Sequence, residues 1–221
     1  MLQQPIKKFF VAGGFMDTDV ALVMERAGME LTSFNEAELV VFTGGADVSP
    51  EYYGEKRIPG VACNPSRDTV EKAQFITARD AGKAFIGICR GAQLLHVLHG
   101  HKLWQDVNFH ALGGAPHTTY DLVSGDVVMT TSCHHQMMRV DDVNDPKNDF
   151  KVVAISDRST HRRAQDVTFR VAKDQIAFRN DIEVLWYPET NSLCYQGHPE
   201  FGNDKCRNYF YRLMKRYGYI S

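Results

Sequence analysis

The sequence has no long hydrophobic run, no paired-cysteine motif and no marked excess of charge of one sign. No window approaches the roughly 18 consecutive apolar residues that a membrane-spanning helix needs, and the first residues lack the apolar core of a signal peptide. Lys and Arg total 25 and Asp and Glu total 27, which gives a net charge of −2. We therefore expect a cytoplasmic protein whose partners include neither a nucleic acid nor a membrane.

The number and spacing of the cysteines argue against a disulfide framework and against a structural zinc site. The chain has 5 cysteines at long spacings, and no two of them form a C-x-x-C pair. We therefore expect reduced thiols rather than a disulfide framework, and no structural zinc site. Cys63, Cys194 and Cys206 are interpreted as packing residues, because a lone cysteine usually behaves as a small buried hydrophobe.

Composition and patterning favour one α/β domain that spans residues 1–221. Hydrophobic residues make up 43% of the chain and charged residues 24%, which is typical of a globular protein. Apolar runs closed by glycines alternate with amphipathic segments, which indicates a largely parallel sheet covered by helices. No internal repeat or low-complexity linker marks a domain boundary. Strands are predicted over residues 8–12, 39–43, 84–88, 126–130, 152–155, 167–171, 182–187 and 193–196, and helices over residues 17–27, 68–81, 90–99 and 204–217.

Asp68 and Glu71 have the spacing of a capping box. In this motif the first residue caps the N-terminus of a helix, and the residue three positions later returns a hydrogen bond. We therefore expect the second helix to begin at Asp68.

The segment around Cys89 has the pattern of a nucleophile elbow. A hydrophobic strand ends in Gly87-Ile88-Cys89-Arg90-Gly91, and a helix follows at once. Glycines fit two positions before and after the nucleophile because larger side chains would collide in so tight a turn. The helix N-terminus favours the thiolate of Cys89, and the backbone N–H of Arg90 can point at a developing oxyanion. The alternative is a buried cysteine at a strand end with glycines for packing.

A cysteine nucleophile needs a base and a group that orients the base. Among the 9 histidines, His198 is the best candidate, because it follows a short apolar strand and precedes Pro199 and Glu200. Pro199 disfavours a helical conformation at His198, so the side chains of His198 and Glu200 can face the same way. Taken alone, this segment fits a surface histidine beside a proline turn better.

Together, the two segments resemble class I glutamine amidotransferases. Within that superfamily the sequence is most similar to the γ-glutamyl hydrolase and γ-glutamyl-GABA hydrolase branch, and the resemblance covers most of the chain. Further matches in the same order lie at the glycine-rich loop 43–55, at Arg67-Asp68 and at residues 104–106, 132–136 and 186–190.

The resemblance implies a flavodoxin-like three-layer α/β sandwich. Its central sheet would be mostly parallel, with antiparallel strands added in the second half. The resemblance also implies a catalytic triad of Cys89, His198 and Glu200, a thioester intermediate, and no metal or organic cofactor. By the same resemblance, the oxyanion hole would combine the Arg90 amide with one from Gly44 or Gly45.

The family's substrate-binding positions correspond to four residues of this chain. Gln93 would help to hold the glutamate part of the substrate, and the alternative for it is a helix surface residue. Cys133, His134 and His135 would contact the α-carboxylate or α-amino group. The alternative for His134 and His135 is that they only anchor their loop.

The chain departs from the family pattern at two places. Ala46 stands where the family commonly has a third glycine, which can reshape the oxyanion loop. The segment 156–180 carries more residues than expected, and we interpret it as a solvated hairpin, with a partner-docking or lid element as the alternative. Its charged residues are Asp157, Arg158, His161, Arg162, Arg163, Asp166, Arg170, Lys173, Asp174 and Arg179.

The leading functional hypothesis is an enzyme that hydrolyses the γ-amide of glutamine or a γ-glutamyl amide. In one version the protein is a glutaminase that supplies ammonia to a separate synthetase or amidoligase. In the other it is a free-standing γ-glutamyl hydrolase. The hypothesis from a different class is a non-catalytic binding protein on the same fold, which would not require Cys89, His198 and Glu200 together.

Overall fold

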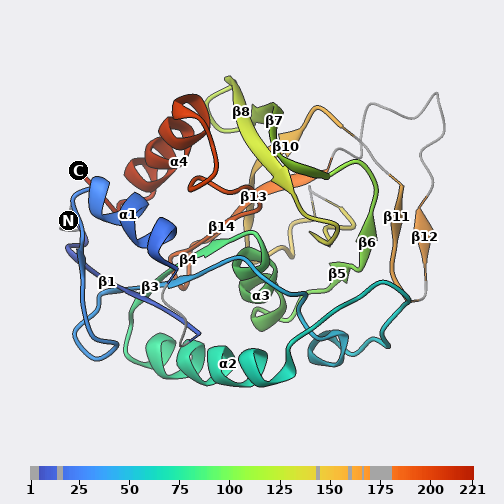
Figure 1. Cartoon of the computed structure of the whole chain (residues 1–221), viewed down its shortest axis with the longest axis horizontal. Coiled ribbons are helices and arrows are strands. Elements are labelled where there is room, and N and C mark those ends of the chain that lie inside the picture. Colours follow the sequence, from blue (N-terminus) through green and yellow to red (C-terminus); the bar gives the residue numbers. More distant parts are fainter. Residues whose placement is uncertain (1–4, 14–16, 143–144, 159–160, 166, 170–180) are drawn as a thin grey trace.

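The computed structural model describes residues 5–13, 17–142, 145–158, 161–165, 167–169 and 181–221. These residues form a nine-stranded sheet with the strand order β2-β1-β3-β4-β14-β13-β10-β7-β8 (Figure 1). In that order the strands are Glu30–Leu31, Lys8–Val11, Leu39–Phe42, Ala84–Ile88, Ser192–Tyr195, Ile182–Tyr187, Lys151–Ser156, Ala111–Asp121 and Val127–Cys133.

The sheet is parallel on one side and antiparallel on the other. Strands β2, β1, β3, β4 and β14 pair in parallel, whereas each pairing from β14 through β13, β10 and β7 to β8 is antiparallel. The expectation of a central, largely parallel sheet with antiparallel strands added by the second half is confirmed. Every residue of β3 and β4 is buried, as expected for parallel strands with both faces covered.

Within the described part of the chain, four α-helices cover the two faces of the sheet. Helices α1 (Thr18–Arg26) and α4 (Asp204–Arg216) pack on one hydrophobic cluster, and α2 (Pro65–Asp80) and α3 (Arg90–Leu98) contribute to the other. Alternate residues of the central strands divide between the clusters: Val41 and Ile86 face the first, and Val40 and Phe85 face the second. Figure 1 shows α1 with α4 on one side of the sheet and α2 with α3 on the other, so the three-layer arrangement is confirmed.

The predicted start of α2 is wrong. The helix begins at Pro65, and the side chain of Asn64 caps it by accepting a hydrogen bond of 3.1 Å from the backbone nitrogen of Arg67. Asp68 and Glu71 lie inside the helix and are completely buried. Their carboxylates form ion pairs with Arg90 and therefore do not cap the helix.

Strand β7 was not predicted from the sequence. It contains Gly113, Gly114 and Pro116, which are residues that weaken a strand pattern. Both glycines have positive φ, at the irregularity where β7 shifts its register against β8. Pairing with β10 and β8, rather than local propensity, therefore maintains this strand.

Two small sheets flank the nine-stranded sheet. One has the order β12-β11-β6 and the other pairs β5 with β9. The predicted strand 167–171 coincides with β12 for two residues, and residues 170–171 lie outside the described part of the chain. These strands are β5 (Leu103–Trp104), β6 (Asp106–Val107), β9 (Met137–Met138), β11 (Arg162–Arg163) and β12 (Thr168–Phe169), and a 3₁₀ helix spans Pro50–Tyr53.

Candidate active site

Cys89 occupies a strained turn between β4 and α3. It is the N-cap of α3 and has φ 51° and ψ −110°, a backbone conformation that is uncommon for a residue with a side chain. The residue is buried, with 6% of its surface exposed. This geometry confirms the predicted elbow, and such strain is typical of functional positions.

The glycines on either side of Cys89 are required by backbone contacts. A Cβ at Gly87 would lie 2.5 Å from the backbone nitrogen of Ala92, and a Cβ at Gly91 would collide with the carbonyl group of Phe42. The prediction that glycines alone fit these positions is confirmed. As a result, β4, α3 and the end of β3 approach one another closely at Cys89.

His198 is held between Cys89 and Glu200 just beyond the end of β14. Its Nδ1 lies 2.6 Å from Glu200 Oε1, and its backbone nitrogen donates a hydrogen bond of 2.6 Å to Thr131 Oγ1. Burial lowers the pKa of the His198 ring, but hydrogen bonds with Cys89 and Glu200 outweigh it and raise that pKa to about 11. The geometry thus favours an imidazolium beside the sulfur atom of Cys89 at neutral pH.

The Gly44-Gly45 turn follows β3 and lies directly against His198. A Cβ at Gly44 would lie 2.8 Å from His198 Cε1, and Gly45 has φ 140°. The turn, Cys89 and His198 therefore meet at the carboxyl ends of parallel strands, where ligands of open α/β sheets bind.

The side chain of Arg90 points away from solvent into a buried ion-pair cluster. Only 2% of Arg90 is exposed, and its guanidinium pairs with Asp68 and Glu71. Burial and the nearby Arg67 lower the pKa of Arg90 to about 10. This role of Asp68 and Glu71 was not predicted, although an arginine at the start of a buried, mainly apolar helix could have signalled that acidic partners exist.

Gln93 is buried and contacts the loop that follows β8. Its Nε2 donates a hydrogen bond of 2.9 Å to the carbonyl oxygen of Gln136, so the alternative of a helix surface residue is excluded. His134 is buried in the same loop, and its Nδ1 lies 2.8 Å from the Gln136 carbonyl oxygen. Cys133 is exposed.

His135 links that loop to the glycine-rich loop. Its Nε2 lies 3.0 Å from Asp47 Oδ2, and this hydrogen bond raises the pKa of His135 although burial opposes it. Asp47 Oδ2 also accepts a hydrogen bond of 2.8 Å from the backbone nitrogen of Ala62. The two loops that border Cys89 and His198 are therefore connected to each other.

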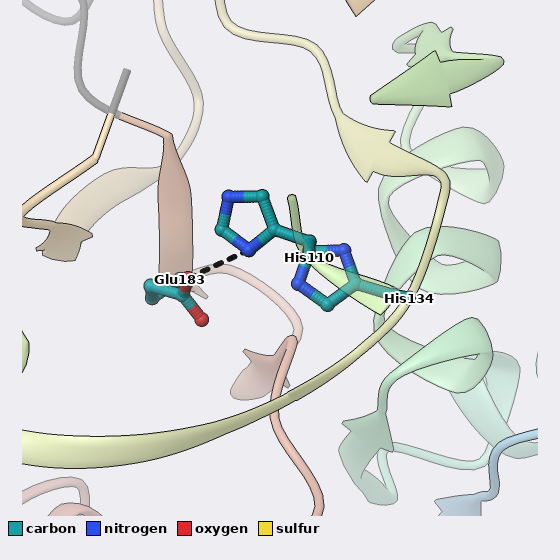
Figure 2. A group of neighbouring side chains, drawn as sticks. All are labelled: His110, His134 and Glu183. Carbon is teal, nitrogen blue, oxygen red and sulfur yellow. Dashed lines mark ion pairs between the residues drawn. The ribbon is translucent and has the colours of Figure 1, made fainter. Parts of the chain in front are cut away.

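A second cluster of buried polar side chains lies behind His134 and was not predicted. Figure 2 shows His110, His134 and Glu183, with the Nδ1 atom of His110 3.9 Å from Glu183 Oε1. His110 Nε2 lies 2.7 Å from Asp181 Oδ2, and His117 Nε2 lies 2.8 Å from Glu183 Oε1. The cluster connects β7, β8 and β13 with the loop that carries His134.

The histidine and carboxylate side chains of this cluster are of the kinds that bind metal ions. His110, His134 and Glu183 each have one nitrogen or oxygen atom that could bind a metal ion, and these three atoms lie within 4.8 Å of one another. However, the rings of His110 and His134 stack, with centroids 4.5 Å apart and planes 29° apart. A metal ion must lie near the plane of each ring at about 2.0–2.1 Å from the nitrogen, and two stacked rings do not direct their lone pairs to one such point. We therefore interpret the cluster as a hydrogen-bonded core.

Part of the 156–180 segment is described, and its strands β11 and β12 form a hairpin. Strands β11 and β12 pair with each other, and β11 also pairs with β6. Arg162 is buried, and its Nη2 lies 2.5 Å from Asp181 Oδ1. Asp166, Arg170, Lys173, Asp174 and Arg179 lie outside the described residues.

Comparison with known proteins identifies a family. The peptidase C26 family matches residues 19–161 of this chain. The glutamine amidotransferase-like protein YvdE of Lactococcus lactis is 46% identical over 70 residues, which are 31% of this chain and 30% of that protein. Protein NtpR of Enterococcus hirae is 32% identical over 84 residues, which are 38% of this chain and 35% of that protein. The alignments thus span about a third of the length of these curated relatives.

Solved structures with low sequence identity share the fold. PurLQS from Thermotoga maritima aligns with a TM-score of 0.61 at 18% identity and covers 97% of this chain and 99% of the other. The glutaminase domain of Trypanosoma brucei CTPS, solved with bound acivicin, aligns with a TM-score of 0.59 at 12% identity and covers 98% and 95%. The chain therefore has the flavodoxin-like fold of the class I glutaminases. Within the described residues, no helix is both long and apolar enough to cross a membrane.

Proposed function

The chain belongs to the peptidase C26 family, and on that premise we propose that it hydrolyses the γ-amide of glutamine or of a γ-glutamyl amide through a thioester on Cys89. The observation that carries this proposal is the meeting of Cys89, His198 and Glu200 at a strained elbow. A non-catalytic binding protein would not need a strained cysteine beside a histidine that a carboxylate orients.

In the proposed first step, the Cys89 thiolate attacks the γ-carbonyl carbon and forms a tetrahedral intermediate. The backbone N–H of Arg90 and one from the Gly44-Gly45 turn stabilise its oxyanion. His198 then gives its proton to the leaving nitrogen, and ammonia or an amine departs as the thioester forms.

In the second step, His198 takes a proton from a water molecule that attacks the thioester carbonyl. Collapse of this intermediate breaks the carbon–sulfur bond and releases the γ-carboxylate, and Cys89 returns to the thiolate. Glu200 stabilises the imidazolium whenever His198 is protonated and holds the ring in place in both steps. These steps require no metal ion or organic cofactor.

For substrate binding we propose Gln93 and the loop at Cys133, His134 and His135. Gln93 and His134 both contact the carbonyl oxygen of Gln136, so they hold this loop against the helix that follows Cys89. Since His134 Nδ1 faces a carbonyl oxygen, it carries a proton, and Nε2 is left as a buried acceptor. An acceptor of this kind suits the α-ammonium group of a glutamyl substrate.

Within this reaction class we propose a glutaminase that passes ammonia to a separate synthetase, with residues 1–221 acting as one domain in the cytoplasm. The glutamine amidotransferase-like relatives support the reaction, and the fold likeness to PurLQS and to the CTPS glutaminase domain supports a synthetase partner. The five free cysteines agree with a reducing compartment.

The second candidate is a free-standing hydrolase similar to γ-glutamyl-GABA hydrolase. Its support is the resemblance of the segments around Cys89 and His198 to the γ-glutamyl hydrolase branch.

The test compares the purified protein with Cys89→Ala on glutamine and on γ-glutamyl-GABA, by release of ammonia, glutamate and amine. We expect one substrate to be hydrolysed and Cys89→Ala to abolish its turnover, while Cys63→Ala retains it. Preference for glutamine supports the glutaminase, and preference for γ-glutamyl-GABA supports the second candidate. Turnover that survives Cys89→Ala, or a Cys89 that iodoacetamide does not alkylate at neutral pH, would refute the proposal.

A further inference from the structure

We propose that Arg67 is a positioning residue for this reaction, because it fixes the orientation of the peptide groups in the turn that binds the oxyanion. Its Nη1 donates a hydrogen bond of 2.9 Å to the carbonyl oxygen of Gly44. Its Nη2 donates to the carbonyl oxygen of Thr43 at 3.2 Å and to Thr43 Oγ1 at 3.1 Å. One planar guanidinium therefore holds two successive carbonyl groups. This inference rests on the proposed function.

Fixing these carbonyl groups also fixes the amide groups that follow them. In a trans peptide the N–H points opposite to the carbonyl oxygen. With the carbonyl oxygens of Thr43 and Gly44 directed at Arg67, the N–H groups of Gly44 and Gly45 point to the other side of the turn. The α-carbon of Gly44 faces the ring of His198, because a Cβ added there would lie 2.8 Å from His198 Cε1. Arg67 and His198 thus contact different sides of the same turn.

The orientation of the peptide groups in the Gly44-Gly45 turn must be fixed by a residue outside the turn. Glycine has no side chain to restrict rotation, so the peptide between Gly44 and Gly45 can reverse at little steric cost. Reversal would present a carbonyl oxygen where an N–H must meet the negative oxygen of the intermediate. The loss of one such donor lowers kcat by about 10²–10³.

Glu71 connects Arg67 with Arg90, which lies on the other side of the proposed oxyanion site. Arg67 Nε donates a hydrogen bond of 2.8 Å to Glu71 Oε1, and Glu71 Oε2 pairs with Arg90. Glu71 is completely buried. One carboxylate therefore connects the arginine that holds the glycine turn with the arginine whose backbone N–H is the other proposed donor.

The cluster is balanced in charge, which is consistent with its burial. Arg67 and Arg90 carry two positive charges, and Asp68 and Glu71 carry two negative charges. Asp68 Oδ2 also accepts a hydrogen bond of 3.0 Å from the backbone nitrogen of Ser49, in the loop that follows the turn. A purely structural role for Arg67 would change stability when the residue is removed, but would not change kcat selectively.

The experiment compares wild type, Arg67→Ala, Arg67→Lys and the control Arg79→Ala, which alters an exposed arginine in the last turn of the same helix. Three quantities are measured: kcat and KM on the substrate identified above, the alkylation rate of Cys89 by iodoacetamide, and the amide NMR signals of Gly44 and Gly45. For Arg67→Ala we expect kcat to fall about 10²–10³-fold. KM and the alkylation rate should remain within about threefold, because the nucleophile and His198 are untouched.

Two further results are expected if Arg67 acts on the turn. Added guanidinium should restore part of the kcat of Arg67→Ala. The kcat of Arg67→Lys should lie between the values of wild type and Arg67→Ala, because an ammonium group cannot make the two parallel hydrogen bonds of a planar guanidinium. The Gly44 and Gly45 signals should shift or broaden in Arg67→Ala but not in Arg79→Ala.

Unchanged kcat, or Gly44 and Gly45 signals identical to those of wild type in Arg67→Ala, would overturn the inference. The NMR result decides the positioning role even if wild type hydrolyses neither glutamine nor γ-glutamyl-GABA. In that case the proposed function fails separately. If wild type is active, a change confined to the signals, with kcat unchanged, would leave Arg67 as a structural support of the turn only, which overturns its role in catalysis.

Discussion

Glu200 Oε1 lies 2.6 Å from His198 Nδ1, and this contact determines how the ring can act. Because a carboxylate only accepts hydrogen bonds, Nδ1 carries a proton, and Nε2 is left to interact with Cys89. The same contact helps to raise the pKa of His198 to about 11, so the ring remains protonated at neutral pH.

Replacing Glu200 with Gln is expected to lower the pKa of His198, since a negative charge that favours the imidazolium is removed. The ring then loses its proton at a lower pH than in wild type. NMR titration of the His198 ring protons measures this shift, and we expect kcat to fall about 10²–10⁴-fold. An unchanged titration would show that Glu200 does not interact with the protonated ring.

Gly44→Ala is expected to reduce activity without unfolding the protein. A Cβ at this position would lie 2.8 Å from His198 Cε1, so the ring or the turn must move. We expect kcat to fall at least tenfold, a barrier increase of about 1.4 kcal/mol, with the melting temperature nearly unchanged. Full activity of Gly44→Ala would contradict the close approach of the turn to His198.

Arg90→Ala is expected to destabilise the protein strongly. Removing this guanidinium leaves Asp68 and Glu71 buried beside a single remaining arginine, and breaking a buried pair of this kind costs about 3–5 kcal/mol. Arg79→Ala removes the exposed pair with Asp80 and a contact of the Arg79 guanidinium with the Phe75 ring, and it should change the free energy of unfolding by about 1 kcal/mol or less. Denaturant unfolding of the two variants measures the difference. Equal effects would refute the importance of the buried cluster.

Chelation is expected to change neither activity nor melting temperature. The cluster of His110, His134 and Glu183 offers donors, but stacking of the two rings prevents their lone pairs from meeting at one ion. Prolonged dialysis against EDTA, followed by thermal unfolding and the hydrolysis assay, tests this expectation. A lower melting temperature that added zinc restores would show that the cluster binds a metal.

Phe201 is expected to influence the choice of leaving amine. Its ring stacks on His198, with centroids 4.8 Å apart, and 59% of the residue is exposed. Because His198 protonates the leaving nitrogen in the proposed reaction, the amine departs beside this ring. Phe201→Ala should raise KM several-fold for γ-glutamyl anilides but much less for glutamine. Equal changes for both substrates would exclude a role in the choice of amine.

Features that depend on neighbouring residues could be predicted from the sequence. The strands β3 and β4 are continuous apolar runs, and the elbow at Cys89 follows from two glycines that a tight turn requires. His198 and Glu200 lie two residues apart after a strand, so their contact is also local. Their assignment as catalytic residues remains a prediction until the hydrolysis assay is done.

The tertiary structure decided those features that depend on residues distant in the chain. Asp68 and Glu71 have the spacing of a capping box, but Arg90, about 20 residues further along the chain, forms ion pairs with both carboxylates. Strand β7 has glycines and a proline and exists because β8 and β10 pair with it. Local patterns report propensity and periodicity, whereas burial of charge and pairing of strands are settled only when separate segments pack together. For that reason the sequence by itself determined the strained elbow at Cys89 and the central strands, while packing determined what holds the Gly44-Gly45 turn in place.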